Sequence, residues 1–300
     1  MEDSRTRKYI LTTAWAAILT ISLFKIILQE IFHYTVSEDL QSGIAALVVI
    51  TGFALTFLWK TIRPLRQFFG LFIILVSAQW LVYNQIDQLP IYQTWLGNPS
   101  FNIKMLAEQS LNLMVAMIII AFLFILKKKR QAFFLAWGDT AAQVEPIKWL
   151  GVKSGEKWST FGRILAIFLS LGTLAFLVIA GRPPLDIVVK ALPFLPAVLL
   201  AATLNAFYEE MTYKASFLAV LEGVVGKQQA LYLMAAFFGI FHFYGIPYGI
   251  IGVLMATFLG WLLGKSMLET RGLFWAWFLH FLQDVLIFAF LAIGSIAPGG

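Results

Sequence analysis

Two adjacent acidic residues, Glu209 and Glu210, follow a long apolar stretch, and Lys214 comes four residues after the second of them. A glutamate and a lysine at this helical spacing share one face, so Lys214 is expected to hold Glu210. Because consecutive helical residues lie about 100° apart, Glu209 points to another face, in line with Asn205 and Tyr213. A carboxylate without a neighbouring cation near an apolar layer suits a general base. The alternative is that both glutamates lie at the water line and end a helix.

Two of the three histidines lie in strongly apolar stretches, where an ionisable group is costly and indicates function. His242 ends a run of aromatic and small residues, and His280 lies four residues before Asp284, on the same helical face. Asp284 can orient the imidazole or share its proton, or the two can form a simple polar pair. His33 is expected in a solvated loop. We therefore predict that Glu209 and the two apolar histidines share a site.

Three short motifs occur in order in the second half of the chain: Glu-Glu-x-x-x-Lys from Glu209, Phe-x-x-x-His from Phe238 and His-x-x-x-Asp from His280. This order and spacing resemble the CPBP family of intramembrane proteases, which includes CAAX prenyl endopeptidases and bacterial bacteriocin-processing or immunity proteins. The family pattern is EExxxR, FxxxH and HxxxN or HxxxD. The resemblance covers roughly residues 165–290.

The resemblance implies a mechanism of peptide hydrolysis. Glu209 and His242 match the positions taken to activate the water that attacks the scissile carbonyl. His280 and Asp284 match the positions taken to stabilise the oxyanion. The residues expected to support the site are Glu210, Lys214, Phe238 and Asn205.

Two positions depart from the family pattern. Lys214 replaces the usual arginine. A lysine cannot form the bidentate hydrogen bonds of a guanidinium, so its interaction with Glu210 should be less rigid. Asp284 stands where some members have asparagine. An ionised aspartate would repel an oxyanion, so Asp284 must be protonated or act through His280.

A metal ion is one open question. Glu209, His242 and His280 would form an acceptable zinc set with one open position. The same residues also serve a metal-free glutamate mechanism, which is favoured because it uses each of them without a cation. The cofactor is therefore either none or a single zinc ion.

The elements that carry these residues are predicted from composition. The chain has 300 residues, of which 60% are hydrophobic and 13% charged, and a mean hydropathy of +0.82. Globular chains are about one quarter charged, so a soluble enzyme, a disordered chain and a coiled-coil rod are excluded. The absence of cysteine excludes a disulfide framework, a thiolate nucleophile and cysteine-bound zinc. We predict an all-α, polytopic transmembrane bundle of eight or nine spans.

A membrane helix needs about 20 mainly apolar residues. The candidate spans are roughly 9–28, 42–59, 67–84, 110–126, 164–181, 188–207, 229–244, 248–264 and 272–294. The seventh and eighth are short and can be broken near Gly245 to Tyr248, so eight spans is the alternative. An even number of spans would put both termini on one side.

The distribution of lysine and arginine predicts the orientation. With the N-terminus inside, 18 of the 22 basic residues fall on the cytoplasmic side, in segments 1–8, 60–66, 127–163, 208–228 and 265–271. Because basic residues stay preferentially in the cytoplasm, the N-terminus and loop 127–163 are predicted to be cytoplasmic. The protein is expected in the plasma membrane if its source is bacterial.

Loop 127–163 begins with a basic run and is expected to form an anchor followed by an interfacial amphipathic helix. The loop separates an N-terminal four-span region, residues 1–126, from a CPBP-like catalytic membrane domain, residues 164–300. Nearly all polar residues within predicted spans belong to the second part.

These observations favour an intramembrane endopeptidase that cleaves a peptide bond of a membrane-associated or lipidated substrate. Its expected partners are membrane lipids and a peptide or lipidated protein, and no nucleic acid. One alternative is a non-catalytic immunity or scaffold relative. Another is a proton-coupled transporter that uses Glu209 and the histidines as a relay, although the chain has no convincing internal repeat.

Overall fold

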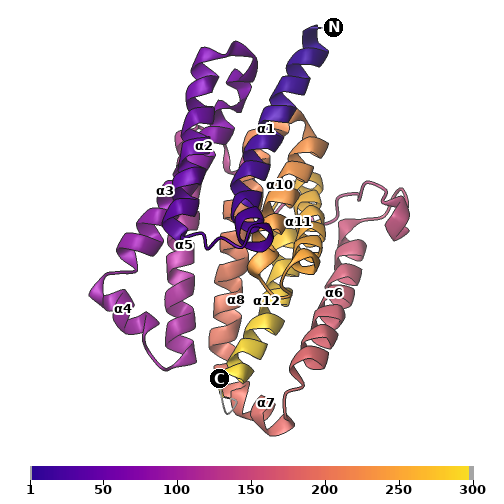
Figure 1. The fold of residues 1–300 in the computed structure, drawn as a ribbon. Coiled ribbons are helices and arrows are strands. Elements are labelled where there is room, and N and C mark those ends of the chain that lie inside the picture. The colour runs from indigo at the N-terminus through magenta and orange to yellow at the C-terminus, as the bar shows by residue number, and fades with distance from the viewer. Residues whose placement is uncertain (1, 297–300) are drawn as a thin grey trace.

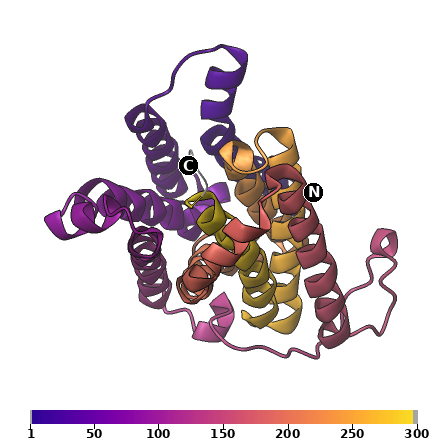
Figure 2. The ribbon, with the colours of Figure 1, turned by 90° about the horizontal axis from the view of Figure 1, so that it is seen from below.

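The computed structural model describes residues 2–296, and this part of the chain is all-α (Figure 1). Its α-helices are α1 (Glu2–Ile26), α2 (Glu38–Leu58), α3 (Arg66–Leu81), α4 (Pro90–Leu96), α5 (Phe101–Ile125), α6 (Trp158–Gly181), α7 (Leu185–Ala191), α8 (Leu195–Glu209), α9 (Ser216–Val225), α10 (Lys227–Phe241), α11 (Ile250–Thr270) and α12 (Phe274–Gly294). Viewed from below (Figure 2), α1 to α5 lie on one side of the bundle, α6 on the other, and the C-terminal helices between them.

Within residues 2–296, eight helical segments are long and apolar enough to cross a membrane, which identifies a multi-pass integral membrane protein. They are Ser4–Ile31, Leu40–Leu58, Lys60–Ile86, Phe101–Ile125, Trp158–Gly181, Leu185–Val225, Ile250–Thr270 and Phe274–Gly294. The prediction of a polytopic helical bundle is confirmed, with eight rather than nine long spans.

The predicted span at 229–244 corresponds to α10, which has only 15 residues and ends at Phe241. A helix of this length rises about 22 Å, less than the hydrocarbon core of about 30 Å. A single 3₁₀ turn, His242–Tyr244, follows it. The short helix still runs as a separate pass between α9 and α11. Counting this short pass, the chain crosses the bundle an odd number of times, so α1 begins at one end of the molecule and α12 ends at the other (Figure 1). The placement of both termini on one side, expected for an even number of spans, does not apply.

The sixth span is longer than predicted. After α8 the chain continues through a π-helical segment, η7 (Glu210–Ala215), directly into α9. A π-helix makes i→i+5 hydrogen bonds and often marks a functional site. Segment 208–228, expected as a cytoplasmic connection, is therefore mainly helix. The two glutamates lie in the middle of a continuous helical segment instead of ending one.

Helices α10 and α11 pack closely because small residues line their contact. A Cβ on Gly239 would lie 2.8 Å from the Cα of Thr257, and one on Gly260 would lie 2.9 Å from the ring of Phe238. Gly264 similarly faces Met234. Side chains larger than hydrogen at these positions would push the helices apart. The close contact fixes the ring of Phe238 beside the polar residues of η7.

The N-terminal helices share a hydrophobic core with the C-terminal ones. Phe72 of α3 packs edge-on against Phe217 of α9 and Phe237 of α10, with ring centroids 5.1 and 5.2 Å apart. Phe217 and Phe237 stack at 4.7 Å. Edge-to-face aromatic pairs of this kind stabilise a packed interior beyond their buried area. The polar site described below lies against this core.

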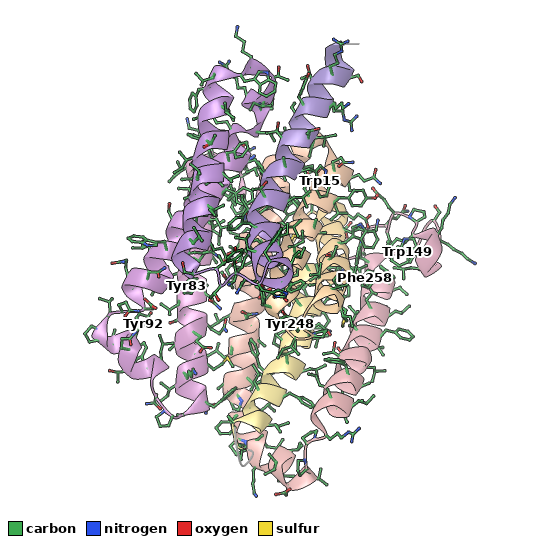
Figure 3. All side chains as sticks on the ribbon, in the orientation of Figure 1. Trp15, Tyr83, Tyr92, Trp149, Tyr248 and Phe258 are labelled. Atoms are coloured by element: carbon green, nitrogen blue, oxygen red, sulfur yellow. The ribbon has the colours of Figure 1, made fainter. Side chains whose placement is uncertain are left out.

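Loop 127–163 does not form the expected interfacial helix. Within it the structure has two short 3₁₀ segments, Arg130–Phe133 and Lys148–Leu150, and two isolated β-bridges. Gly151 and Gly155 adopt positive φ angles of +74° and +88°, which interrupt helical geometry. The exposed Trp149 packs on Phe258 at the edge of the molecule (Figure 3).

Candidate active site

Glu210 and Lys214 form the buried centre of the site. Both side chains are completely buried, and Lys214 Nζ lies 2.8 Å from Glu210 Oε1. The ion pair that the spacing predicts is therefore present. Glu210 Oε1 also accepts a hydrogen bond of 2.6 Å from Nδ1 of His280, on α12. The hydrogen bond from His280 joins η7 to α12, and Lys214, within η7, balances the charge of the same oxygen.

Glu209 is the last residue of α8 and has a less complete set of partners. Its Oε1 accepts a hydrogen bond of 3.3 Å from Asn205 Nδ2. Its Oε2 lies 3.6 Å from His280 Nε2 and has no hydrogen-bond partner among residues 2–296. The Glu209 side chain is 20% exposed, whereas those of Glu210 and His280 are 0% and 7% exposed. Glu209 is thus the more open of the two glutamates.

Asp284 completes the group of carboxylates. Its Oδ1 lies 3.6 Å from His280 Nε2, and its Oδ2 accepts a hydrogen bond of 3.1 Å from Asn205 Nδ2. The same amide nitrogen therefore bridges Asp284 and Glu209. Three carboxyl groups face two groups that can be cationic, Lys214 and protonated His280. Full ionisation of these groups would leave one unbalanced negative charge.

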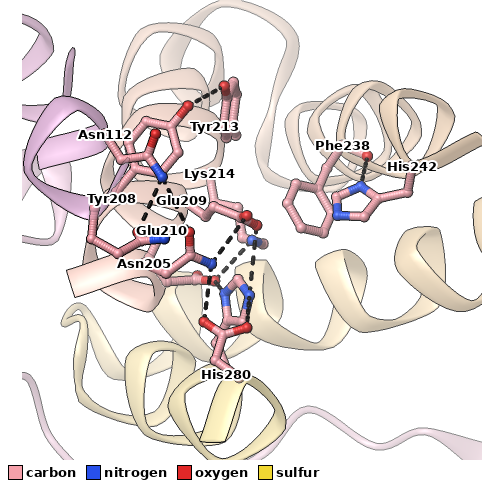
Figure 4. A network of polar contacts seen from close by, with 12 residues as sticks. Asn112, Asn205, Tyr208, Glu209, Glu210, Tyr213, Lys214, Phe238, His242 and His280 are labelled. Carbon is pink, nitrogen blue, oxygen red and sulfur yellow. Dashed lines mark hydrogen bonds and ion pairs between the residues drawn. The ribbon is translucent and has the colours of Figure 1, made fainter. Parts of the chain in front are cut away.

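His242 lies apart from the cluster, at the end of α10 (Figure 4). Its Nδ1 lies 2.7 Å from the carbonyl oxygen of Phe238, and its ring packs on the Phe238 ring at 4.4 Å. The Phe238 ring in turn contacts His280 edge-on and covers Lys214 Nζ at 3.5 Å. In the described part of the chain, no hydrogen bond or ion pair joins His242 to Glu209 or His280.

The structure therefore brings most of the predicted site residues together. Direct polar contacts connect Asn205, Glu209, Glu210, Lys214, His280 and Asp284. Phe238 stands between this group and His242. The cation–π contact of Phe238 with Lys214 gives that aromatic residue a defined place in the site.

A zinc site is not supported by the arrangement. Among residues 2–296, no three His, Asp or Glu side chains are placed so that they could hold one ion. Nδ1 of His280 is hydrogen-bonded to Glu210, and the ring of Phe238 separates His242 from the other two residues of the set. The set Glu209, His242 and His280 does not fit a metal in this geometry, and the mechanism below includes no step through one.

The π-helical segment also changes a predicted alignment. In an α-helix Tyr213 would lie over Glu209, but its hydroxyl instead lies 2.6 Å from that of Tyr208, five residues earlier. Gln79 of α3 donates a further hydrogen bond of 2.9 Å to the Tyr213 hydroxyl. The wider π-helical turn brings residues i and i+5 together, which the 3.6-residue period did not predict.

Sequence reasoning missed polar residues of the N-terminal region. Asn112 of α5 lies with its Nδ2 3.5 Å from Asn205 Oδ1, and its own Oδ1 accepts a hydrogen bond of 2.5 Å from the Tyr83 hydroxyl. The expectation that residues 1–126 hold little intramembrane polarity overlooked this contact. The available signal was Gln109 and Asn112 within an otherwise apolar helix.

An apolar cavity of about 450 Å³ lies beside the site, between α8, α12 and the start of loop 127–163. Its lining residues are Leu135, Ala136, Trp137, Thr203, Leu204, Phe207, Leu273, Phe274 and Trp277. Thr203 is the single polar residue among them. Such a cavity can accept an apolar group of considerable size.

Fold and site together define a polytopic helical membrane protein with a buried carboxylate and imidazole cluster. Residues 191–286 match the family model described as type II CAAX prenyl endopeptidase Rce1-like. This segment is an Rce1-like domain of the CPBP family, as the motifs indicated, and it contains Glu209, His242, His280 and Asp284. It covers about one third of the chain and leaves α1 to α6 outside. No curated protein and no solved structure matches the chain.

Proposed function

We propose that the protein is an intramembrane endopeptidase that hydrolyses a peptide bond of a membrane-associated or lipidated substrate. The observation that carries the proposal is Glu209, whose side chain is 20% exposed while that of Glu210 is completely buried, and whose Oε2 lies 3.6 Å from His280 Nε2. A partly exposed carboxylate beside an imidazole is suited to take a proton from water. The family of residues 191–286 makes a peptide bond the expected target.

In the proposed mechanism Glu209 removes a proton from a water molecule, and the oxygen of that water attacks the scissile carbonyl carbon. The carbonyl oxygen becomes an oxyanion. Protonated His280 stabilises it by donation from Nε2, and Asp284 acts through His280. Glu209 then gives its proton to the departing amine as the carbon–nitrogen bond breaks. The products are a carboxylic acid, which keeps the second proton of the water, and a free amine.

The supporting residues keep the reacting groups in place. Glu210 holds Nδ1 of His280, so Nε2 remains turned toward Glu209 and Asp284. Lys214 balances the charge of Glu210. His242 binds the Phe238 carbonyl through Nδ1, which leaves Nε2 free for a further polar contact.

The apolar cavity supports a substrate with a lipid or strongly apolar segment. It is formed by α8 and α12, the two helices that carry Glu209 and His280. An apolar group bound there would stand next to the proposed catalytic residues. The substrate would thus enter from the membrane, with loop 127–163 on the cytoplasmic side as the charge distribution indicates.

The experiment is cleavage of quenched fluorescent peptides, with and without a lipid group, by the purified full chain in lipid nanodiscs. Glu209→Gln should reduce kcat by about 100-fold or more, the size expected for a general base. Glu222→Gln is the control, because Glu222 pairs with the exposed Arg271 and, in the described part of the chain, forms no hydrogen bond or ion pair with a residue of the site. Wild-type chain without cleavage, or Glu209→Gln with wild-type cleavage, would refute the proposal and favour a non-catalytic scaffold.

A further inference from the structure

Asn205 connects two carboxylates of the site, those of Glu209 and Asp284, by hydrogen bonds. It is 9% exposed, and its single amide nitrogen donates to Glu209 Oε1 and to Asp284 Oδ2, at 3.3 and 3.1 Å. An amide nitrogen has two hydrogens, so each carboxylate receives one. This arrangement requires that Asn205 turn its nitrogen toward the carboxylates and its oxygen away from them.

The side chain that meets the oxygen of Asn205 comes from the N-terminal region. Asn112 Nδ2 lies 3.5 Å from Asn205 Oδ1 and also donates to Gln109 Oε1 at 3.0 Å. The Tyr83 hydroxyl donates to Asn112 Oδ1 at 2.5 Å. Tyr83 lies in η3 (Val82–Ile86), the π-helical segment that continues α3. Its hydroxyl therefore fixes which way the Asn112 amide faces.

These bonds form a chain with one direction. Tyr83 donates to the carbonyl of Asn112, Asn112 donates to the carbonyl of Asn205, and Asn205 donates to the carboxylates (Figure 4 shows its inner part). If the Asn112 amide were reversed, its oxygen would face the oxygen of Asn205. Leaving buried polar atoms unpaired is unfavourable, so the two amides hold each other in this orientation.

We propose that Tyr83 and Asn112 are positioning residues of the active site, which orient Glu209 and Asp284 through Asn205. The proposal rests on the proposed peptidase function. It assigns a role to α3 and α5, which lie outside the segment that matches the family. Neither residue touches a reacting atom. Their effect is on the placement of the base, where an error of about 1 Å can cost about 100-fold in rate.

The experiment measures kcat and KM of the full chain with Asn112→Leu and with Tyr83→Phe. Asn112→Leu keeps the branching and the number of side-chain heavy atoms, and Tyr83→Phe removes only the hydroxyl group. Each should lower kcat about 10-fold or more and change KM less than about two-fold, because orientation acts on the transition state. The double variant should lose little more than Asn112→Leu, because both substitutions interrupt one chain.

Ser110→Ala is the matched control. Ser110 also lies on α5, and its hydroxyl contacts the Ala107 carbonyl and the Tyr92 hydroxyl without reaching Asn205. It should keep wild-type kcat. If Asn112→Leu does not fold, as judged by size exclusion, Tyr83→Phe alone decides the question.

The outcomes separate the two proposals. The positioning role alone would be overturned if Asn112→Leu and Tyr83→Phe had the kcat of Ser110→Ala, while the wild-type chain cleaves and Glu209→Gln does not. A loss confined to KM would overturn it as well. Absence of cleavage by the wild-type chain would reject the peptidase function and, with it, this role for the N-terminal helices.

Discussion

Replacing Lys214 with methionine tests the buried ion pair most directly. Methionine keeps much of the length of the lysine stem and removes the charge. Lys214 and Glu210 are both 0% exposed and lie 2.8 Å apart. The substitution would therefore leave the Glu210 carboxylate buried with His280 as its remaining hydrogen-bond donor.

The expected loss can be worked out from these contacts. Removing one partner of a buried ion pair typically costs about 3–5 kcal/mol of unfolding free energy. The contact of Lys214 Nζ with the Phe238 ring at 3.5 Å is lost as well, which adds about 1 kcal/mol. Proton uptake by Glu210 offsets part of this cost, so we expect Lys214→Met to lose about 3 kcal/mol or more.

The assay is thermal unfolding of the full chain in detergent, followed by the fluorescence of its 10 tryptophans. Where unfolding is irreversible, the half-life at a fixed temperature replaces the free energy. Lys190→Met is the control, because the side chains of Lys190 and Asp186 are 61% and 65% exposed and such an exposed pair should contribute little to stability. The double variant Glu210→Gln with Lys214→Met should recover much of the loss. Equal stability of Lys214→Met and Lys190→Met would refute the reasoning.

Two further predictions concern loop 127–163. Hydrogen bonding to Lys227, with nearby Lys265, lowers the pKa of Glu145 below its usual 4.5. Wild type should therefore be more stable than Glu145→Gln above pH 4.5, and this difference should disappear as the pH falls through the lowered pKa. Thermal unfolding at a series of pH values measures it. Because the chain has no cysteine, single Lys153→Cys and Arg182→Cys substitutions report sidedness: an impermeant maleimide should label Arg182→Cys in intact cells and Lys153→Cys only after permeabilisation, and the reverse result would invert the topology.

Much of the fold followed from the sequence because long apolar segments have few alternatives in a membrane. Hydrophobicity also marked α10 and its short length, since the predicted span 229–244 is close to the 15-residue helix. The glycines that let α10 and α11 approach closely act through tertiary contacts, which a hydropathy pattern does not contain. Loop 127–163 was predicted as an interfacial helix from its amphipathic pattern alone. That pattern does not contain the local turns in which Gly151 and Gly155 adopt positive φ angles.

The site was predictable as far as helical spacing reached. The pairs Glu210 with Lys214 and Asn205 with Glu209 are four residues apart, and both contacts are present. The contact between Glu210 and His280 joins residues of different helices, and the spacing of residues along one helix carries no information about it. The contact of Tyr213 with Tyr208 was not predicted, because the chain changes from α-helical to π-helical geometry at Glu210.

Asn112 could not be found from its own segment. A single asparagine in an apolar helix indicates a buried partner but does not say which one. The partner, Asn205, lies 93 positions further along the chain. Only the packing of α5 on α8 joins the two amides, so the contribution of the N-terminal helices to the site is a property of the tertiary fold.

The stability of Glu209→Gln separates a catalytic from a structural role of the cluster. Glu210 is completely buried, and Lys214 and His280 both contact one of its oxygens, as expected of a carboxylate that serves the fold. Glu209 is instead 20% exposed, has no lysine or arginine beside it among residues 2–296, and lies near Asp284 through their common donor Asn205. Removing its charge reduces repulsion among the carboxylates and keeps an oxygen to accept from Asn205.

We therefore expect Glu209→Gln to unfold with a free energy within about 1 kcal/mol of wild type, or above it, while cleavage is lost. A residue that reduces stability and is needed for activity is typical of an active site, where function restricts packing. The measurement is the thermal unfolding described for Lys214→Met, performed side by side. A loss as large as that of Lys214→Met would show that Glu209 is part of the structural network, and the role of general base would then need another carboxylate, of which Asp284 is the nearest to His280 Nε2 at 3.6 Å.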